Sequence, residues 1–282
     1  MNKILITGTR GFVGSRVAKA MGEHYEVLAP SHRECDITRS EVVEEYVRVH
    51  RPHAIVHLAA LSNTGYCEQH PEESMRVNVM GVAHMADAAA RYGCKLVWFS
   101  SDQVYNGNCE LGPLSEDIAV CPENHYGRHK LMAEEEALRR CPNSVALRAT
   151  WMYDIRREGM PTHNNFVLNI EEAIRQHTPL RFATREYRGI TWVDEVVRNM
   201  PHTLELPGGV YPNTIAGVIY ASGQFTPTRS NRVETLAVNG VNETCLQAAR
   251  AAMAGESPVG GAMHFRRAGN HEGIIIGDHV FW

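Results

Sequence analysis

Long apolar runs, signal sequences and paired cysteines are all absent from this sequence of 282 residues. No segment reaches the roughly 18 apolar residues that a membrane-spanning helix requires. The N-terminus, MNKILITG, enters a strand-like segment without the apolar stretch and cleavage site of a signal peptide. The seven cysteines are scattered and form no CxxC pair, which argues against a disulfide or zinc framework. We therefore predict a soluble cytoplasmic protein with reduced thiols and no membrane partner.

An excess of charge of one sign is also absent. The formal net charge is -4, from 28 basic and 32 acidic residues, so we expect no nucleic-acid partner held by bulk charge. No period of about 20 to 50 residues repeats, which argues against solenoids and propellers. Hydrophobic residues make up 44% and charged residues 21%, as in globular chains that bury a core.

The first half of the chain alternates short apolar runs with segments of helical spacing. This alternation is typical of βαβ units around a parallel sheet. Strands are predicted at Lys3–Thr7, Tyr25–Ala29, His53–Leu58, Leu96–Phe99 and Val145–Ala149. Helices are predicted at Phe12–Met21, Ser40–Val49 (with Ser40 as N-cap), Val77–Arg91 and Ala133–Arg140. The predicted fold class is α/β, with a Rossmann-like, doubly wound parallel sheet.

The composition of the chain changes after about residue 205. Residues 207–209 (PGG) open a stretch rich in Gly, Asn and Thr, which contains one helix candidate, Glu243–Ala254, and one apolar run, Gly273–Gly277. We therefore place a domain boundary near Leu206. It separates a nucleotide-binding domain over residues 1–206 from an α+β segment over residues 207–282.

Three glycines with the spacing G-x-x-G-x-x-G follow the first predicted strand. Such a loop permits a tight turn and brings a pyrophosphate close to the N-terminus of the next helix. A glycine-rich turn without a ligand is the alternative, but the order of strand, loop and helix favours dinucleotide binding. The residues predicted to hold the cofactor here are Gly8, Arg10, Gly11, Phe12, Val13 and Gly14.

The end of the second predicted strand selects between NAD and NADP. An Asp or Glu there would bind the 2′-hydroxyl of NAD, but residues 29–33 read Ala-Pro-Ser-His-Arg. Arg33 and Arg10 suit the 2′-phosphate of NADP, unless both arginines only face water. We therefore predict NADP, with NAD as the alternative. Further cofactor contacts are predicted for Asp36, Ile37, Leu58, Ala59 and Ala60.

Tyr126 and Lys130 form the pattern Y-x-x-x-K, and Ser101 lies upstream at the end of a predicted strand. Residues four apart share one face of a helix, so the ammonium group can lie near the phenol and lower its pKa. Such a tyrosine can donate a proton while a nicotinamide transfers a hydride, and a serine can hold the carbonyl oxygen of the substrate. The pattern alone also fits a surface pair, but the glycine loop and the serine favour catalysis.

Together the motifs of this region resemble the extended short-chain dehydrogenases/reductases, and within them the dTDP-4-dehydrorhamnose reductases. The resemblance covers about residues 1–200 and rests on ITGTRGFVG, CDIT, PHAIVHLAA, MRVNVMG, VWFSSDQVYNG, YGRHK, LRATWMY, NFV and GITWVDEVV. It implies that NADPH reduces a 4-keto-6-deoxy sugar on a nucleotide. It also implies that residues 151–188 begin a small substrate lobe.

The resemblance assigns roles to individual residues. Ser101 would orient the keto oxygen, Tyr126 would donate the proton, and Lys130 would bind the nicotinamide ribose and tune the tyrosine. Asn78 would border the cofactor. The family often has Thr in place of Ser101 and has Tyr in place of Gln103, so the sugar specificity stays open. Substrate contacts are implied for Asp102, Gln103, Arg148, Trp151 and Asn165.

The C-terminal segment resembles a different family, the SleB-type cell-wall hydrolases. The resemblance rests on PNTIAGVIYASGQFTP, CLQAARAAMAG, GGAMHF and GDHVFW. Glycan cleavage needs a positioned carboxylic acid, which in that family precedes the PNTI segment. Here that region is reductase-like, and neither Glu186 nor Glu195 lies in the hydrolase motif. The tail histidines, at 264, 271 and 279, lack the spacing of zinc ligands, so we expect no metal site.

Several alternatives to a reductase stay open at this point. A non-catalytic NADP-binding regulatory subunit would use the same cofactor loop. Nucleotide-sugar epimerases and dehydratases share both the loop and the Tyr/Lys pair. A cell-wall hydrolase acting through the tail is the third alternative. The expected partner is a nucleotide-sugar substrate, and a homodimer is left open.

Overall fold

The structure is a computed structural model. It describes residues 1–108, 118–154, 156–163, 165–177, 180–183, 188–212, 235–238, 260–268, 271–276 and 279–281. In this part of the chain no helix is long and apolar enough to cross a membrane. The fold divides into two units: unit 1 contains Met1–Val104, Pro122–Ala149 and Val197–Pro212, and unit 2 contains Tyr105–Cys121, Thr150–Val196 and Asn213–Trp282.

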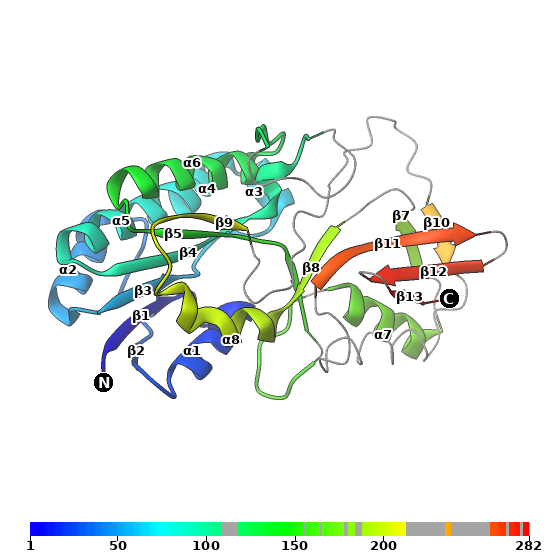
Figure 1. The fold of residues 1–282 in the computed structure, drawn as a ribbon, viewed down its shortest axis with the longest axis horizontal. Coiled ribbons are helices and arrows are strands. Elements are labelled where there is room, and N and C mark those ends of the chain that lie inside the picture. Colours follow the sequence, from blue (N-terminus) through cyan, green and yellow to red (C-terminus); the bar gives the residue numbers. More distant parts are fainter. Residues whose placement is uncertain are drawn as a thin grey trace. The chain divides into compact units, whose positions relative to one another are not determined.

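A parallel sheet of six strands organises unit 1 (Figure 1). Its strands are β1 (Lys3–Thr7), β2 (Glu26–Leu28), β3 (Ala54–His57), β4 (Lys95–Ser101), β5 (Val145–Ala149) and β9 (Gly209–Pro212). Their order is β2-β1-β3-β4-β5-β9, and every pairing is parallel. Strands covered on both faces need apolar side chains throughout, which explains the buried runs Ile4–Ile6 and Ala54–Val56. The predicted α/β class is confirmed.

Helices flank this sheet on both faces. They are α1 (Phe12–Met21), α2 (Ser40–His50), α3 (Thr64–Gln69), α4 (Pro71–Ser74), the π-helix η1 (Met75–Met80), α5 (Gly81–Tyr92), the 3₁₀-helix η2 (Asp102–Tyr105), α6 (His125–Arg140) and α8 (Val193–Thr203). Leu5, Ile55 and Trp98 point to one face and form one buried cluster with side chains of α2, α5 and α6. Because side chains alternate along a strand, Ile4 and Ile6 point to the other face, where α1 lies (Figure 1).

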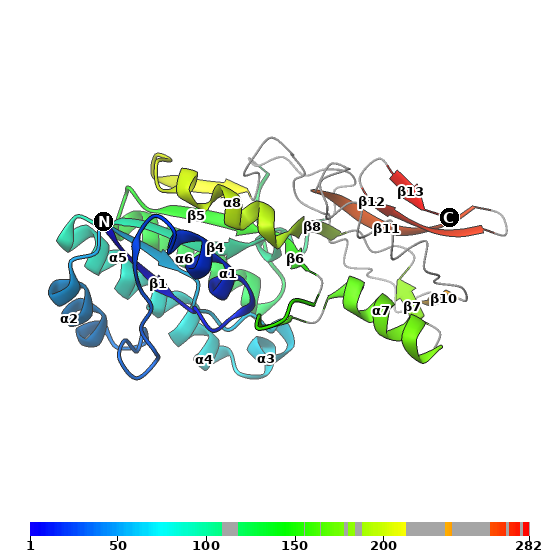
Figure 2. The same cartoon turned by 90° about the horizontal axis from the view of Figure 1, so that it is seen from below.

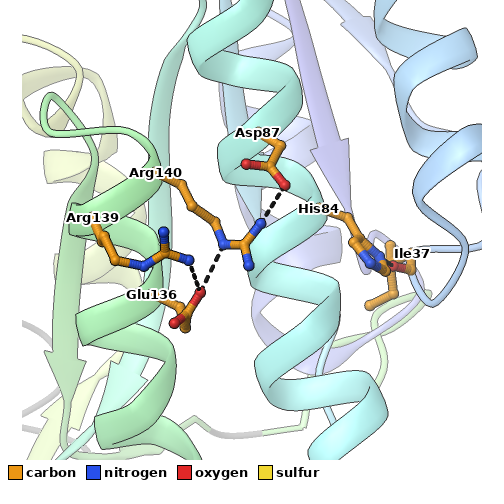
Figure 3. Close-up of polar contacts among 6 residues, drawn as sticks. All are labelled: Ile37, His84, Asp87, Glu136, Arg139 and Arg140. Carbon is orange, nitrogen blue, oxygen red and sulfur yellow. Dashed lines mark hydrogen bonds and ion pairs between the residues drawn. The ribbon is translucent and has the colours of Figure 1, made fainter.

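Polar contacts align α5 with α6 at the surface of this layer (Figure 3). Arg140 on α6 pairs with Glu136 one turn earlier and reaches across to Asp87 on α5. Nδ1 of His84 lies 2.9 Å from the carbonyl oxygen of Ile37, which joins α5 to the loop after β2. Exposed ion pairs contribute little free energy, so they set the alignment of the helices while the buried cluster supplies the stability.

Several predicted element boundaries need correction. Ser40 is the first residue of α2 and Arg39 is its N-cap, so the predicted N-cap is wrong by one residue. The helical stretch predicted at 77–91 begins earlier, with α4 and the π-helix η1. Helix α6 begins at His125, ahead of Tyr126, and runs through the predicted segment Ala133–Arg140; the side chain of Asn124 caps its start by accepting a hydrogen bond from the amide of Gly127 at 2.7 Å.

Unit 2 has its own sheet, in the order β13-β12-β11-β8-β6 (Figure 2). Its strands are β6 (Trp151–Tyr153), β8 (Arg188–Trp192), β11 (Gly260–Ala268), β12 (His271–Ile276) and β13 (His279–Phe281). The strand β8 pairs parallel with β6 and antiparallel with β11. Helix α7 (Phe166–Gln176) and the pair β7 (Leu180–Ala183) and β10 (Thr235–Val238) complete the described elements of this unit.

The unit boundaries and the predicted domain boundary divide the chain differently. Strands on both sides of residue 206 share the sheet of unit 2, and β9 joins β5 in unit 1. The boundary near Leu206 therefore stays a prediction of where the reductase-like sequence ends and the hydrolase-like sequence begins. The apolar run at Gly273–Gly277 corresponds to β12, and the helix predicted at Glu243–Ala254 lies outside the described residues.

Candidate functional site

The glycine loop after β1 is closed so tightly that two positions require glycine. Gly8 has a positive φ of 73°, and a Cβ atom there would lie 2.7 Å from the backbone of Leu58 and Ala59. A Cβ atom on Gly14 would lie 2.1 Å from the carbonyl oxygen of Gly8. The amide of Gly11 donates to that same carbonyl at 2.9 Å. The turn from β1 into α1 therefore packs backbone directly against backbone, which only glycine at these two positions permits.

The segment after β3 lies beside this loop and is held from two sides. The hydroxyl oxygen of Thr7 accepts hydrogen bonds from the amides of Leu58 and Ala59, at 3.1 and 3.2 Å. The side chain of Asn78, in the π-helix, accepts from the amide of Leu61 at 2.9 Å and donates to its carbonyl at 3.0 Å. Asn78 is buried, so it acts on the segment next to the glycine loop through the backbone of Leu61.

A cavity of about 360 Å³ opens at the carboxyl ends of β1 and β3. The strand β1 pairs with β2 on one side and with β3 on the other, so the chain order reverses here. Open α/β sheets bind ligands at this kind of switch point. The cavity is lined by Thr7, Gly8, Thr9, Arg10, Gly11, Pro30, His32, Cys35, Ile37, Thr38, Leu58, Ala59, Ala60 and Val77.

The cavity brings together only part of the predicted cofactor residues. Those that line it are Gly8, Arg10, Gly11, Ile37, Leu58, Ala59 and Ala60; those that do not are Phe12, Val13, Gly14, Arg33, Asp36, Asn78 and Lys130. Among the residues that the sequence reasoning missed, His32 is the direct neighbour of Arg33 and carries its own nitrogen donor. A search for basic residues over the whole turn, rather than for arginine alone, would have found it.

Asp36 shapes the turn instead of facing the cavity. Its carboxylate accepts hydrogen bonds from the amide and the hydroxyl of Thr38, at 2.9 and 2.7 Å. Burial raises the pKa of this carboxyl, but the two Thr38 hydrogen bonds and the nearby His32 and Arg39 outweigh it, so the pKa lies below its usual value. The charged carboxylate thus holds Ile37 and Thr38 where they line the cavity.

Ser101, Tyr126 and Lys130 come together at the carboxyl end of β4, as predicted. Ser101 ends β4, and its hydroxyl lowers the pKa of the Tyr126 phenol. Nζ of Lys130 donates to the carbonyl oxygen of Phe99 at 2.6 Å and lies 5.7 Å from the ring centroid of Tyr126. Both α6 side chains are buried, so β4 and one face of α6 fix this group together.

The electrostatics of the tyrosine differ from the expectation. Burial raises the pKa of Tyr126 above its ordinary value, and it outweighs the hydrogen bond from Ser101, which lowers the pKa. The pKa of Tyr126 therefore lies above its ordinary value instead of below it, because the cost of burying a phenolate is the largest effect. Burial also lowers the pKa of Lys130 to about 8, while Glu134 and Cys67 raise it. Tyr126 is thus protonated at neutral pH.

In unit 1, the residues predicted to contact substrate have partners within the unit. Asp102 accepts from the hydroxyl of Ser101 at 3.2 Å, and the side-chain oxygen of Gln103 accepts from Asn124 at 3.0 Å. Arg148 is different, because its guanidinium forms a bidentate ion pair with the buried carboxylate of Glu134. Arg148 on β5 therefore binds α6 through the side chain of Glu134.

Trp151 and Asn165, also predicted to contact substrate, belong to unit 2. Trp151 begins β6 and is half-buried. Asn165 is buried and precedes α7, where its side chain accepts from the amide of Leu168 at 3.1 Å and donates to the carbonyl of Asp154 at 3.0 Å. Asn165 therefore fixes the start of α7.

Two family models match this chain. The model described as RmlD substrate binding domain matches residues 1–229, and the model described as Cell Wall Hydrolase matches residues 184–282. The two matches overlap over residues 184–229. The second match agrees with the SleB-like resemblance of the tail.

Individual proteins agree with the first match. A dTDP-4-dehydrorhamnose reductase of Aggregatibacter actinomycetemcomitans is 29% identical over 198 residues, which are 70% of this chain and 65% of that protein. Methionine adenosyltransferase 2 subunit beta of Danio rerio is 33% identical over 159 residues, 54% of this chain and 48% of that protein. The chain thus spans less than two thirds of the length of these relatives. The crystal structure of a Bacillus anthracis dTDP-4-dehydrorhamnose reductase in complex with NADP has the same fold, with a TM-score of 0.69 at 24% identity, covering 75% of this chain and 74% of that one.

Proposed function

Because the chain belongs to the RmlD substrate-binding-domain family, we propose that it is an NADPH-dependent reductase of a 4-keto-6-deoxy sugar carried on a nucleotide. One observation carries this proposal. Ser101, Tyr126 and Lys130 are assembled at the end of β4, in the same unit as the glycine-loop cavity. A proton donor and a dinucleotide cradle on one sheet are the parts that carbonyl reduction needs.

The residues present fit a dinucleotide. The glycines Gly8 and Gly14 draw the turn tightly together at the N-terminus of α1, where backbone amides would bind the pyrophosphate. Arg10 would hold the 2′-phosphate of NADP, with His32 and Arg33 in the turn after β2. The bound cofactor supplies the hydride. NAD remains the second choice, and contacts from Phe12, Val13, Asp36 and Asn78 are part of the proposal.

The side chains of unit 1 would carry out the proton chemistry. The Ser101 hydroxyl holds the keto oxygen, and Tyr126 keeps its proton until negative charge develops on that oxygen, because burial disfavours the phenolate. Tyr126 then transfers the proton, and the Lys130 ammonium stabilises the phenolate that forms. Lys130 also has a role at the nicotinamide ribose in this proposal. Asp102, Gln103, Trp151 and Asn165 are proposed substrate contacts.

The test is turnover of NADPH with a dTDP-4-keto-6-deoxy sugar. Tyr126→Phe removes the proton donor and leaves the ring in place, so we expect kcat to fall by about 100-fold to 10,000-fold. NADPH binding, measured by fluorescence titration, should be unchanged in this variant. Full turnover by Tyr126→Phe would overturn the assigned role.

A second candidate is a non-catalytic, NADP-binding regulatory subunit. One observation favours this candidate. A relative with 33% identity over 159 residues is named as a subunit of a methionine adenosyltransferase. This candidate predicts that the chain binds NADPH but reduces no keto-sugar. Binding with no turnover, across a panel of nucleotide-linked 4-keto sugars, would support it over the reductase.

A further inference from the structure

Helix α6 buries a second charged side chain directly behind Lys130. Glu134 lies four residues further along the helix, on the same face, and each of the two residues is 3% exposed. Both are bound to consecutive residues of β4. Nζ of Lys130 donates to the carbonyl oxygen of Phe99 at 2.6 Å, and the hydroxyl of Ser100 donates to the carboxylate of Glu134. Two opposite charges therefore fasten α6 to β4.

Arg148 on β5 completes this network. Its Nε donates to Oε1 of Glu134 at 3.0 Å and its Nη2 to Oε2 at 2.7 Å, in the bidentate geometry of strong carboxylate pairs. Ser100 and Arg148 are paired in the register of β4 and β5, so their side chains reach the same carboxylate. A buried carboxylate needs this compensation, because an unpaired charge is strongly unfavourable in a protein interior.

The ammonium of Lys130 faces groups from several elements. The ring of Trp98 on β4 lies 5.6 Å away and the ring of Tyr126 on α6 lies 5.7 Å away. Cys67 of α3 and Glu134 of α6 raise the pKa of Lys130 against the effect of burial. His57 of β3 interacts with the same charge and is neutral, because burial and Lys130 hold its pKa at about 3. Among the groups named here, Glu134 is the one with a carboxylate.

We propose that Glu134 and Arg148 are positioning residues for the reduction proposed above. Glu134 keeps Lys130 in its ammonium form beside Tyr126. Arg148 binds the carboxylate from the other side, so that Glu134 does not draw the ammonium away from the Phe99 carbonyl. This positioning role rests on the proposed function. The effect of Glu134 and Arg148 on the charge of Lys130 can nevertheless be measured without any turnover.

The chain has four lysines, Lys3, Lys19, Lys95 and Lys130, which makes a direct titration practical. In protein labelled with ¹³C at lysine Cε, four NMR signals report the four ammonium groups, and Lys130→Arg identifies the one from Lys130. Glu134→Gln should lower the titration midpoint of Lys130 by about one pH unit or more, because two buried cations then lie near each other. Arg148→Gln should raise the midpoint, because it leaves the Glu134 charge uncompensated.

Controls separate this effect from a general change of charge or fold. Glu135→Gln removes the same charge from the adjacent, exposed position of α6 and should leave the midpoint unchanged. Glu134→Asp keeps the charge and withdraws it by one methylene, so it should lower the midpoint less than Glu134→Gln. Circular dichroism verifies that each variant is folded. An unmoved Lys130 midpoint in folded Glu134→Asp and Glu134→Gln would overturn the proposal.

Kinetics separate this proposal from the proposed function. If the chain reduces a keto-sugar, the alkaline limb of the kcat profile should move with the NMR midpoint in each variant, whereas the profile of Glu135→Gln should match the parent protein. If the midpoint moves but no substrate turns over, the reductase assignment fails and the effect of Glu134 on Lys130 stands. If turnover is present and the midpoint does not move, the positioning role fails.

Discussion

The carbonyl oxygen of Gly8 occupies the space that a side chain on Gly14 would need, because a Cβ atom on Gly14 would lie only 2.1 Å from that oxygen. The two residues lie on opposite sides of the turn from β1 into α1. The loop is therefore shaped by backbone packing.

Gly14→Ala should abolish NADPH binding and lower the melting temperature. The backbone atoms that meet the new methyl group cannot move without opening the turn. Thermal unfolding with and without NADPH measures both effects, and in the parent protein a hundredfold excess of ligand over Kd should add about 2.7 kcal/mol. Gly65→Ala is a matched control, because the new methyl group would meet only a side-chain oxygen, at 3.4 Å. If NADPH raised the melting temperature of Gly14→Ala as much as that of the parent protein, the glycine loop would not be the phosphate-binding site.

Arg10→Ala should weaken NADPH binding by about tenfold and leave NADH binding nearly unchanged, because a charge-assisted contact to the 2′-phosphate is lost. Arg10 lines the cavity and Arg33 does not, so Arg33→Ala should have the smaller effect. Isothermal titration calorimetry with NADPH and with NADH gives the ratio of the two dissociation constants for each variant. Arg91→Ala, on the exposed end of α5, serves as the control. Equal losses for NADPH and NADH would remove the argument for NADP.

Acid should destabilise the protein through His57. Burial and Lys130 lower the pKa of this imidazole to about 3, whereas its unfolded value is 6.5. A depressed folded pKa means that the stabilisation is fully present above pH 6.5 and is lost as the pH falls toward 3. Between pH 7 and pH 5 the loss from this residue should be about 2 kcal/mol.

Urea unfolding at the two pH values measures this loss. The variant His57→Gln cannot titrate, so its stability should fall less on acidification than that of the parent protein. Exposed His24→Gln is the matched control and should follow the parent. An identical pH dependence in the parent and His57→Gln would show that the imidazole does not contribute.

The Cell Wall Hydrolase match over residues 184–282 should not correspond to hydrolytic activity. Glycan cleavage needs a positioned carboxylic acid, and the region where the hydrolases carry it is also matched by the reductase family here. Turbidity of purified cell walls, incubated with the full chain, measures the activity directly. Clearing of the walls would show that the tail is an enzyme in its own right.

Local sequence signals predicted several elements of unit 1. The bounds of β1, α1 and β5 agree with the predicted ones, because short apolar runs and glycines act within a few residues. The π-helix η1 and the strand β9 were not predicted. A π-helix differs from an α-helix only in its hydrogen-bond register, and β9 depends on an open edge of β5 that exists only in the folded sheet.

The sequence by itself determined two local features of the proposed site. The glycine spacing dictates a tight turn between β1 and α1, and the four-residue interval between Tyr126 and Lys130 places them on one helical face. Tertiary structure decided which charges are buried and therefore how they behave. Burial keeps the proton on Tyr126, and the pairing of β4 with β5 brings Ser100 and Arg148 to Glu134. Desolvation and cross-strand contacts depend on residues far apart in the chain, so no local pattern records them.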